Sequence, residues 1–119
     1  MILIIGGASS GKRTYTESLG FVEEDFVNAR LDTGHVLYNL QELVHDTILD
    51  DEALLEALDS YDIIICTENG SGIVPLSADN RAWRDRTGRI CSRIAEKADV
   101  VVRMVCGIPT ALKGELPCN

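Results

Sequence analysis

The residues with the clearest chemical potential lie near the N-terminus, where glycines, small polar residues and a lysine follow an apolar run. The run Met1-Ile2-Leu3-Ile4-Ile5 is followed by Gly6-Gly7-Ala8-Ser9-Ser10-Gly11-Lys12-Arg13-Thr14. Glycines let backbone N–H groups converge on phosphate oxygens, a helix N-terminus adds partial positive charge, and a lysine supplies an ammonium. Gly6, Gly11 and Lys12 have the spacing of the first seven positions of G-x-x-x-x-G-K-[ST]. The segment is therefore predicted to be a strand, a phosphate-binding loop and a helix.

The eighth position departs from this motif, because Arg13 occupies the place of a serine or threonine. That hydroxyl normally ligates Mg²⁺, whereas a guanidinium has only hydrogen-bond donors and cannot bind a cation. Thr14 offers a hydroxyl one residue later, turned by about 100° around a helix. We predict that residues 6–14 bind a nucleotide, that Lys12 is catalytic, and that Thr14 is a candidate Mg²⁺ ligand. The alternative is a glycine-rich turn that binds nothing.

A second polar turn follows another apolar run. The run Ile63-Ile64-Ile65-Cys66 leads through Thr67 into Glu68-Asn69-Gly70-Ser71-Gly72. It is apolar on both faces, as expected of a central parallel strand, and ligands in open α/β sheets bind beyond the carboxyl ends of such strands. Glu68 is therefore a candidate catalytic residue and metal ligand, and Asn69 is a candidate substrate contact. A solvated loop acid is the alternative interpretation of Glu68.

The longest predicted helix runs from Ser77, as N-cap, to about Ala98. Its core-facing stripe is predicted to contain Trp83, Thr87, Ile90, Cys91, Ile94 and Ala98. The same helix carries the basic residues Arg81, Arg84, Arg86, Arg89, Arg93 and Lys97. Arg81 and Arg84 lie nearest the Glu68 turn and are candidate contacts for a ligand phosphate. The remaining basic residues are predicted to be solvated or paired with the helix's own acids, which are Asp79, Asp85 and Glu96.

The rest of the chain predicts an α/β fold with a mainly parallel sheet. The expected elements are a helix over 12–19, a loop leading to a brief strand over 21–28, a helix over 36–48, a helix capped by Asp50 or Asp51, a strand over 99–106, and a final edge strand or tail. The helix over 36–48 is predicted from the apolar residues Val36, Leu37, Leu40, Leu43, Val44 and Ile48, which recur at helical spacing.

Composition limits the functional classes. With 119 residues and 45% hydrophobic content, the chain is expected to form one domain, 1–119. A net charge of −8 argues against nucleic-acid binding, and no apolar run approaches the roughly 18 residues of a membrane span. A cytoplasmic protein is expected. Cys66, Cys91 and Cys106 are predicted to be buried thiols, and the state of Cys118 is left open.

Two ordered blocks of residues resemble the bifunctional adenosylcobinamide kinase/adenosylcobinamide-phosphate guanylyltransferase family of cobalamin biosynthesis. The first block is residues 1–12. The second contains Thr67-Glu68-Asn69-Gly70-Ser71-Gly72-Ile73-Val74-Pro75, Arg84-Asp85, Gly88-Arg89, Ala98-Asp99 and Cys106-Gly107-Ile108-Pro109. Together the blocks cover roughly 65 of the 119 residues. The resemblance implies a P-loop-type three-layer α/β/α fold, a ring-like homo-oligomer, and transfer of phosphate and then GMP to a corrinoid, with GTP or ATP and Mg²⁺.

The chain also departs from the family pattern. Arg13 replaces a serine, the segment between the blocks is short, and neither His35 nor His45 lies in the family's guanylyl-acceptor motif. Two hypotheses therefore remain. The first is an enzyme that transfers a phosphoryl or nucleotidyl group to cobinamide. The second is a catalytically silent nucleotide-binding homologue that acts as a partner or regulator.

Overall fold

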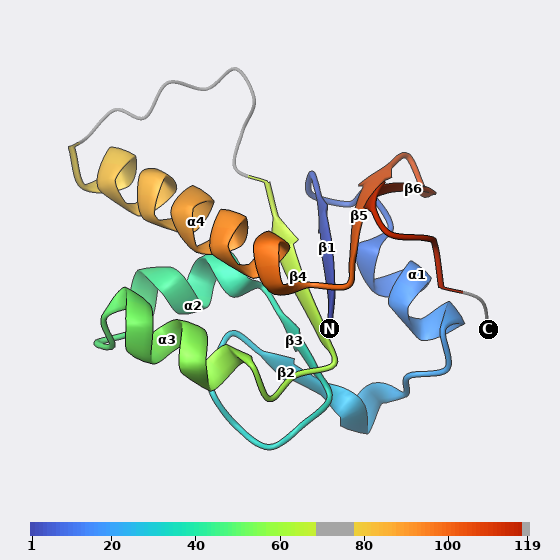
Figure 1. Ribbon diagram of the computed structural model, residues 1–119, viewed down its shortest axis with the longest axis horizontal. Coiled ribbons are helices and arrows are strands. Elements are labelled where there is room, and N and C mark those ends of the chain that lie inside the picture. Colours follow the sequence, from blue (N-terminus) through green and yellow to red (C-terminus); the bar gives the residue numbers. More distant parts are fainter. Residues whose placement is uncertain (69–77, 118–119) are drawn as a thin grey trace.

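The computed structural model describes residues 1–68 and 78–117 and contains a six-stranded sheet (Figure 1). The strands are β1 (Ile2–Gly6), β2 (Phe26–Asn28), β3 (Val36–Tyr38), β4 (Ile63–Thr67), β5 (Val100–Val105) and β6 (Ile108–Lys113). Their order across the sheet is β2-β3-β4-β1-β5-β6. Neighbouring strands from β2 to β5 pair in parallel, and only β6 is antiparallel to its neighbour. The α/β prediction with a mainly parallel sheet is confirmed.

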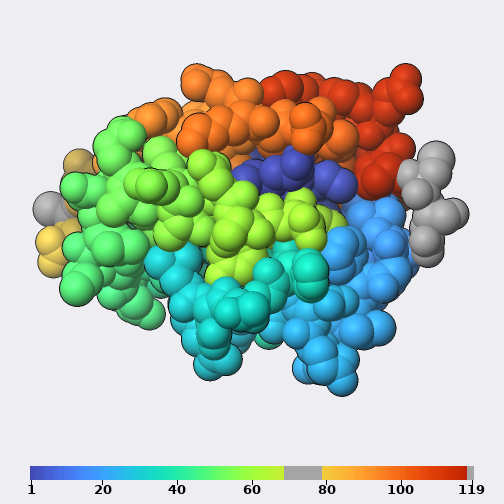
Figure 2. Space-filling view, turned by 60° about the horizontal axis from the view of Figure 1, so that its bottom comes forward, coloured from blue at the N-terminus to red at the C-terminus, as the bar shows by residue number. Residues whose placement is uncertain are grey.

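The central strand is β1, which pairs on one side with β4 and on the other with β5. Ile2 is level with Ile63 and with Val100, so the N-terminal residues lie between two other apolar strands. Figure 2, turned toward this end of the sheet, shows the dark-blue N-terminus between the yellow-green residues entering β4 and the orange residues entering β5. The apolar run 1–5 folds as a strand because both of its faces are covered.

Helices cover the two faces of the sheet unequally. Leu3, Ile64 and Val101 face a core formed with α2 (Leu40–Asp46), α3 (Asp51–Leu58) and α4 (Ala78–Lys97). On the opposite face, Ile4, Ile65 and Val102 pack near α1 (Lys12–Ser18) and the aromatic residues that follow it. Figure 1 shows α2, α3 and α4 grouped on one side and α1 on the other. The chain thus has three layers, with a thinner layer on the α1 side.

The helix that was predicted over 36–48 has wrong bounds at both ends. Val36 and Leu37 form part of β3 and pair with Ile63 and Ile64, where they are completely buried. Sheet pairing therefore overrides the helical spacing of these two residues, in agreement with the context dependence of strand formation. The helix begins only at Leu40, after Asn39 in a left-handed conformation. At the other end, Ile48 lies beyond the helix and is 100% exposed.

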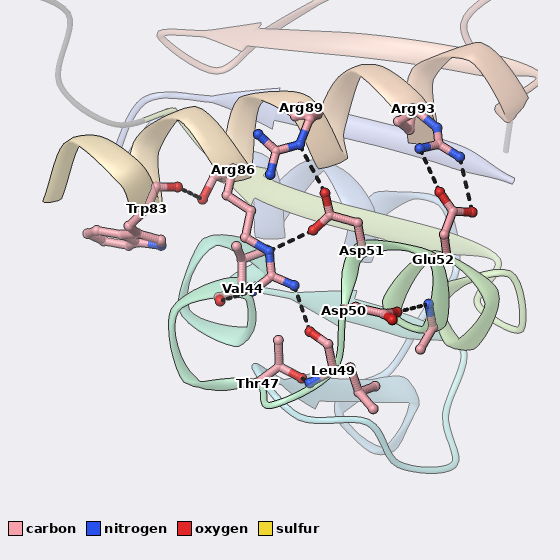
Figure 3. Close-up of polar contacts among 12 residues, drawn as sticks. Val44, Thr47, Leu49, Asp50, Asp51, Glu52, Trp83, Arg86, Arg89 and Arg93 are labelled. Atoms are coloured by element: carbon pink, nitrogen blue, oxygen red, sulfur yellow. Dashed lines mark hydrogen bonds and ion pairs between the residues drawn. The ribbon is translucent and has the colours of Figure 1, made fainter. Parts of the chain in front are cut away.

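Three basic residues of α4 pair with acids of α3, whereas the sequence predicted that they are solvated or paired with acids of their own helix. Arg86 and Arg89 both donate to the Asp51 carboxylate, at 2.8 and 2.9 Å, and Arg93 donates to Glu52 at 3.1 Å (Figure 3). Arg86 also donates to the Leu49 carbonyl oxygen at 2.7 Å. Asp50 accepts from the backbone of Ala53, which confirms it as the N-cap of α3.

The C-terminal elements complete the edge of the sheet. The residues after β5 form β6, which confirms the edge-strand alternative of the prediction. Cys66 is buried and Cys91 is partly buried, but Cys106 is exposed because it lies in the turn between β5 and β6. The prediction of a buried thiol is therefore wrong for Cys106. Among the described residues, no helix is both long and apolar enough to cross a membrane.

Replacing Asp51 tests the junction between α3 and α4. Hydrogen bonds from Arg86 and Arg89 lower the pKa of Asp51, so its stabilising effect is complete above the usual value of 3.8 and is lost as the pH falls through the lower folded-state pKa. Asp51→Asn is expected to lower the free energy of unfolding by about 1–2 kcal/mol at pH 7, measured by urea denaturation. The control is Glu52→Gln on the same helix turn, because the Glu52 side chain is 76% exposed. This change should lower the free energy of unfolding by less than about 0.5 kcal/mol. Equal losses in the two variants would contradict this interpretation.

Candidate functional site

The carboxyl ends of four parallel strands meet at one edge of the sheet and carry the loops of the candidate site. β1 leads into the glycine loop, which we define as residues 6–12, and β4 leads into Glu68. The Glu68 backbone N–H donates to the Gly6 carbonyl oxygen at 2.8 Å, which joins the two loops directly. β3 ends at Tyr38 and is followed by Asn39, and β5 ends at Val105 and is followed by the Cys106–Gly107 turn. The sequence correctly predicted that the first two of these loops share an edge.

The glycine loop packs closely against neighbouring backbone. A Cβ atom on Gly6 would lie 2.6 Å from Ser10 Oγ and 2.7 Å from the Met104 carbonyl oxygen, so only glycine fits without a shift. Gly11 has a φ of +93°, and a Cβ there would lie 3.2 Å from the Gly107 Cα. The Gly107 N–H donates to the Ser10 carbonyl oxygen at 2.9 Å. The β5–β6 turn thus packs directly against the glycine loop. The loop has a conformation that requires glycine.

Lys12 begins α1 and turns its side chain back into the loop. It is only 8% exposed, and its ammonium donates to the Gly7 carbonyl oxygen and to Ser10 Oγ. Burial lowers the pKa of Lys12, while the nearby Cys66 and Glu68 act in the opposite direction. The loop therefore holds a partly desolvated cation, and an anion at the loop would relieve the cost of burying that charge.

The partners of Arg13 lie outside the glycine loop. Its guanidinium pairs with Glu17 at 3.0 Å and with Glu23 at 3.3 Å. It also lies 4.3 Å from the ring centroid of Phe26 and 5.1 Å from that of Tyr38. These contacts fix the side chain between α1 and the adjacent edge of the sheet. Arg13 lines the loop pocket, but its charge is already compensated by acidic partners.

A pocket of about 450 Å³ opens beside the glycine loop. One wall consists of loop and helix residues, which are Ala8, Ser9, Ser10, Gly11, Lys12, Arg13 and Thr14. The other wall comes from the ends of β3 and β4, and it contains Tyr38, Asn39, Ile65 and Thr67. All the predicted nucleotide-binding residues except Gly6 and Gly7 line this pocket, and those two residues form the entry to the loop.

Glu68 and Arg84 line a different hollow from the glycine-loop pocket. A smaller hollow of about 290 Å³ is lined by Glu68 and Arg84 among others, while Arg81 lies on the exposed first turns of α4 and lines neither pocket. The Glu68 carboxylate accepts from Arg103 at 3.4 Å. Asn69 and Ser77 lie outside the described residues. Within the described part of the chain, no group of three or more His, Cys, Asp or Glu side chains could hold a metal ion.

Two residues that form or support the second wall, Asn39 and Gln41, were not identified from sequence. Asn39 and Gln41 join the ends of β3 and β4 through their side-chain amides, and Gln41 is a buried polar residue. Both lie in the segment that was predicted to be one continuous helix, where a polar residue is expected on the solvent face. A signal was present in the sequence, because asparagine is the residue after glycine that most readily starts or ends elements in a left-handed conformation.

The close packing of the loop predicts that two of its glycines, Gly7 and Gly11, differ in how well they tolerate replacement by alanine. Gly11→Ala is expected to lower the free energy of unfolding by about 1–2 kcal/mol, because alanine is strained at this positive φ. Gly7→Ala is the matched control, since a Cβ at Gly7 meets nothing within 4 Å, and its stability should stay within about 0.5 kcal/mol of the wild type. Thermal and urea unfolding measure both values. A Gly7→Ala variant that is as unstable as Gly11→Ala would refute this account of the loop.

Comparison with known proteins identifies the family. Residues 28–112 match the family described as cobinamide kinase / cobinamide phosphate guanyltransferase. The bifunctional adenosylcobalamin biosynthesis protein CobP of Pseudomonas aeruginosa is 40% identical over 67 residues, which are 54% of this chain and 39% of that protein. The aligned part thus spans about two fifths of that relative. The family match begins after the glycine loop, so the interpretation of that loop depends on its own motif and geometry. The predicted family is confirmed, and the chain belongs to the cobinamide kinase / cobinamide phosphate guanyltransferase family.

Proposed function

We propose that the chain binds a purine nucleoside triphosphate, GTP or ATP, through the glycine loop and transfers a phosphoryl or GMP group to a corrinoid in cobalamin biosynthesis. The observation that carries this proposal is the buried Lys12 ammonium, held by loop oxygens at the head of the 450 Å³ pocket. The family supports the reaction class and the cobinamide substrate. The proposed unit is a single domain, 1–119, which assembles as a homo-oligomer.

In this mechanism the residues of the loop stabilise the charge that develops on the transferring group. Backbone N–H groups at the start of α1 point toward phosphate oxygens, and the Lys12 ammonium exchanges its contact with the Gly7 carbonyl oxygen for a phosphate. Mg²⁺ would neutralise phosphate charge there, held by water, phosphate oxygens and the oxygen atoms of Thr14 or Glu68. Thr14 lines the pocket and the Glu68 side chain is 39% exposed, so both oxygens are accessible. Asn69, Arg81 and Arg84 are proposed to contact substrate or phosphate.

Calorimetric titration with GTP and ATP, with and without Mg²⁺, tests nucleotide binding. Lys12→Met is expected to abolish binding, because it removes the buried positive charge while keeping the length of the side chain. Binding by the wild type should weaken as the pH rises and the ammonium loses its proton, beginning below the usual lysine value of 10.5 because burial lowers the pKa of Lys12.

The control is Lys97→Met, which removes a half-exposed lysine at the C-terminal end of α4, where it pairs with Asp59. This variant should bind both nucleotides like the wild type. Absence of binding to either nucleotide by the folded wild-type protein would defeat the proposal. Incubation with labelled GTP, ATP and adenosylcobinamide then tests the reaction. Turnover, or a protein that keeps its label after denaturation at neutral pH, is expected if the chain is an enzyme.

We propose as the second candidate a catalytically silent nucleotide-binding homologue that acts as a partner or regulator. The observation that favours it is Arg13, which occupies the position of the metal-binding hydroxyl and is engaged by Glu17 and Glu23. Binding without turnover, and with an affinity that does not depend on Mg²⁺, supports this candidate over the enzyme.

Replacing Arg13 tests whether the residue after Lys12 determines the effect of Mg²⁺ on nucleotide affinity. Arg13→Ser restores the hydroxyl and is expected to make nucleotide affinity rise at least severalfold on addition of Mg²⁺. Arg13→Ala is the matched control, since it loses the same ion pairs but gains no hydroxyl, and it should show no greater Mg²⁺ effect than the wild type. Calorimetry at fixed ionic strength measures the ratio of affinities. If Mg²⁺ changes the nucleotide affinity of the serine and alanine variants equally, the missing hydroxyl does not explain why nucleotide binding is independent of Mg²⁺.

A further inference from the structure

The wall of the pocket that faces the glycine loop is held together by side-chain amides. Gln41 is 8% exposed, and its Oε1 accepts from the backbone N–H of Thr67 at 3.0 Å. Its Nε2 donates to Asn39 Oδ1 at 3.4 Å, and its backbone oxygen accepts from Trp83 Nε1 at 2.8 Å. Gln41 therefore connects the ends of β3 and β4 to each other and to α4. It fixes the wall without itself lining the pocket.

Asn39 is the member of this group that lines the pocket. Its backbone is left-handed, with a φ of 59° and a ψ of 46°, and its Nδ2 donates to Asn28 Oδ1 at 2.8 Å. A side-chain amide has two N–H donors and two acceptor lone pairs. Within the described chain, the contacts with Asn28 and Gln41 use one donor and one lone pair. The amide thus retains one donor and one acceptor, on a residue that lines the pocket.

The chemistry of the two walls differs in a way that suits two parts of one ligand. The glycine-loop wall offers an ammonium and backbone N–H donors, which match the acceptor oxygens of phosphates. The Asn39 wall offers a donor and an acceptor together, which match a hydroxyl group because a hydroxyl both donates and accepts. A volume of about 450 Å³ is in the range of about 300–1,000 Å³ that holds a whole small molecule, so a ligand can span both walls.

We infer that Asn39 determines specificity by hydrogen-bonding a sugar hydroxyl of the bound nucleotide, and that Gln41 is the positioning residue that orients the Asn39 amide. This inference rests on the proposed function, because the phosphates of the same ligand must occupy the glycine loop. The inference assigns a protein contact to the sugar, which is a part of a nucleotide that bare polyphosphate lacks.

The test compares three ligands on one variant by calorimetry: GTP, 2′,3′-dideoxy-GTP and inorganic tripolyphosphate. Asn39→Gly removes the amide and keeps a residue that accepts the left-handed backbone. It is expected to lower the affinity for GTP about fivefold to tenfold, the value of one hydrogen bond, and to leave the other two affinities unchanged. Equal losses for all three ligands, or no loss for GTP, would overturn the inference.

Two further variants separate positioning from general structural damage. Gln41→Met preserves the length of the side chain and the backbone contact to Trp83 but loses both amide contacts, so it should reproduce the selective loss for GTP. A change that only loosens the fold would weaken tripolyphosphate as well. Ala29→Gly is the matched control, because Ala29 also has a positive φ of 53° but is only partly buried and does not line the pocket. It should bind all three ligands like the wild type.

The outcomes also distinguish this inference from the proposed function. If the wild-type protein binds none of the three ligands, the glycine-loop proposal fails and this inference fails with it. If the wild type binds all three with equal affinity, the phosphate site stands and recognition of the sugar hydroxyl is refuted.

Discussion

The parallel alignment of β3, β4, β1 and β5 is the constraint on which the rest of the structure depends. Parallel strands place their carboxyl ends at one edge, so the loops that follow must meet there regardless of their distance along the sequence. In this chain the register places Gly6 level with Thr67 on one side and with Met104 on the other. A shift by one residue would reverse the faces of a strand and separate these loops, which is why apolar runs with two buried faces are needed at the centre.

Close packing at this edge is matched by unusual electrostatics. A lysine that is 8% exposed normally requires an acidic partner, but the polar contacts of Lys12 are with a carbonyl oxygen and a hydroxyl. The carboxylate of Glu68 is near enough to affect the pKa of Lys12, yet its hydrogen bond comes from Arg103. The result is a charge held mainly by dipoles. Such an arrangement favours an incoming anion because the anion replaces weak dipole contacts with direct charge attraction.

The sequence predicted the parts of the structure whose local pattern agrees with their surroundings. The strands at Ile2 and Ile63 are apolar on both faces, and Asp50 is a strong N-cap, so local preference and final structure coincide. The strand at Val36 was missed because two of its residues, Val36 and Leu37, also fit a helical spacing, and only the pairing with β4 decides between strand and helix. The role of Gln41 was missed for a related reason, since its partners lie 26 and 42 residues away. The directions of Arg13 and Arg86 likewise depend on partners that no local pattern reveals.

The position of Arg13 has a consequence for how this chain can change over evolutionary time. In the motif, the residue after the lysine serves only the ligand, whereas here it joins α1 to Glu23 and to the aromatic pair Phe26 and Tyr38. These contacts connect α1 with the edge of the sheet on its thinner face. A change from arginine to serine would therefore alter packing on that face as well as the chemistry of the loop. Selection on this one position acts on two properties of the protein at once.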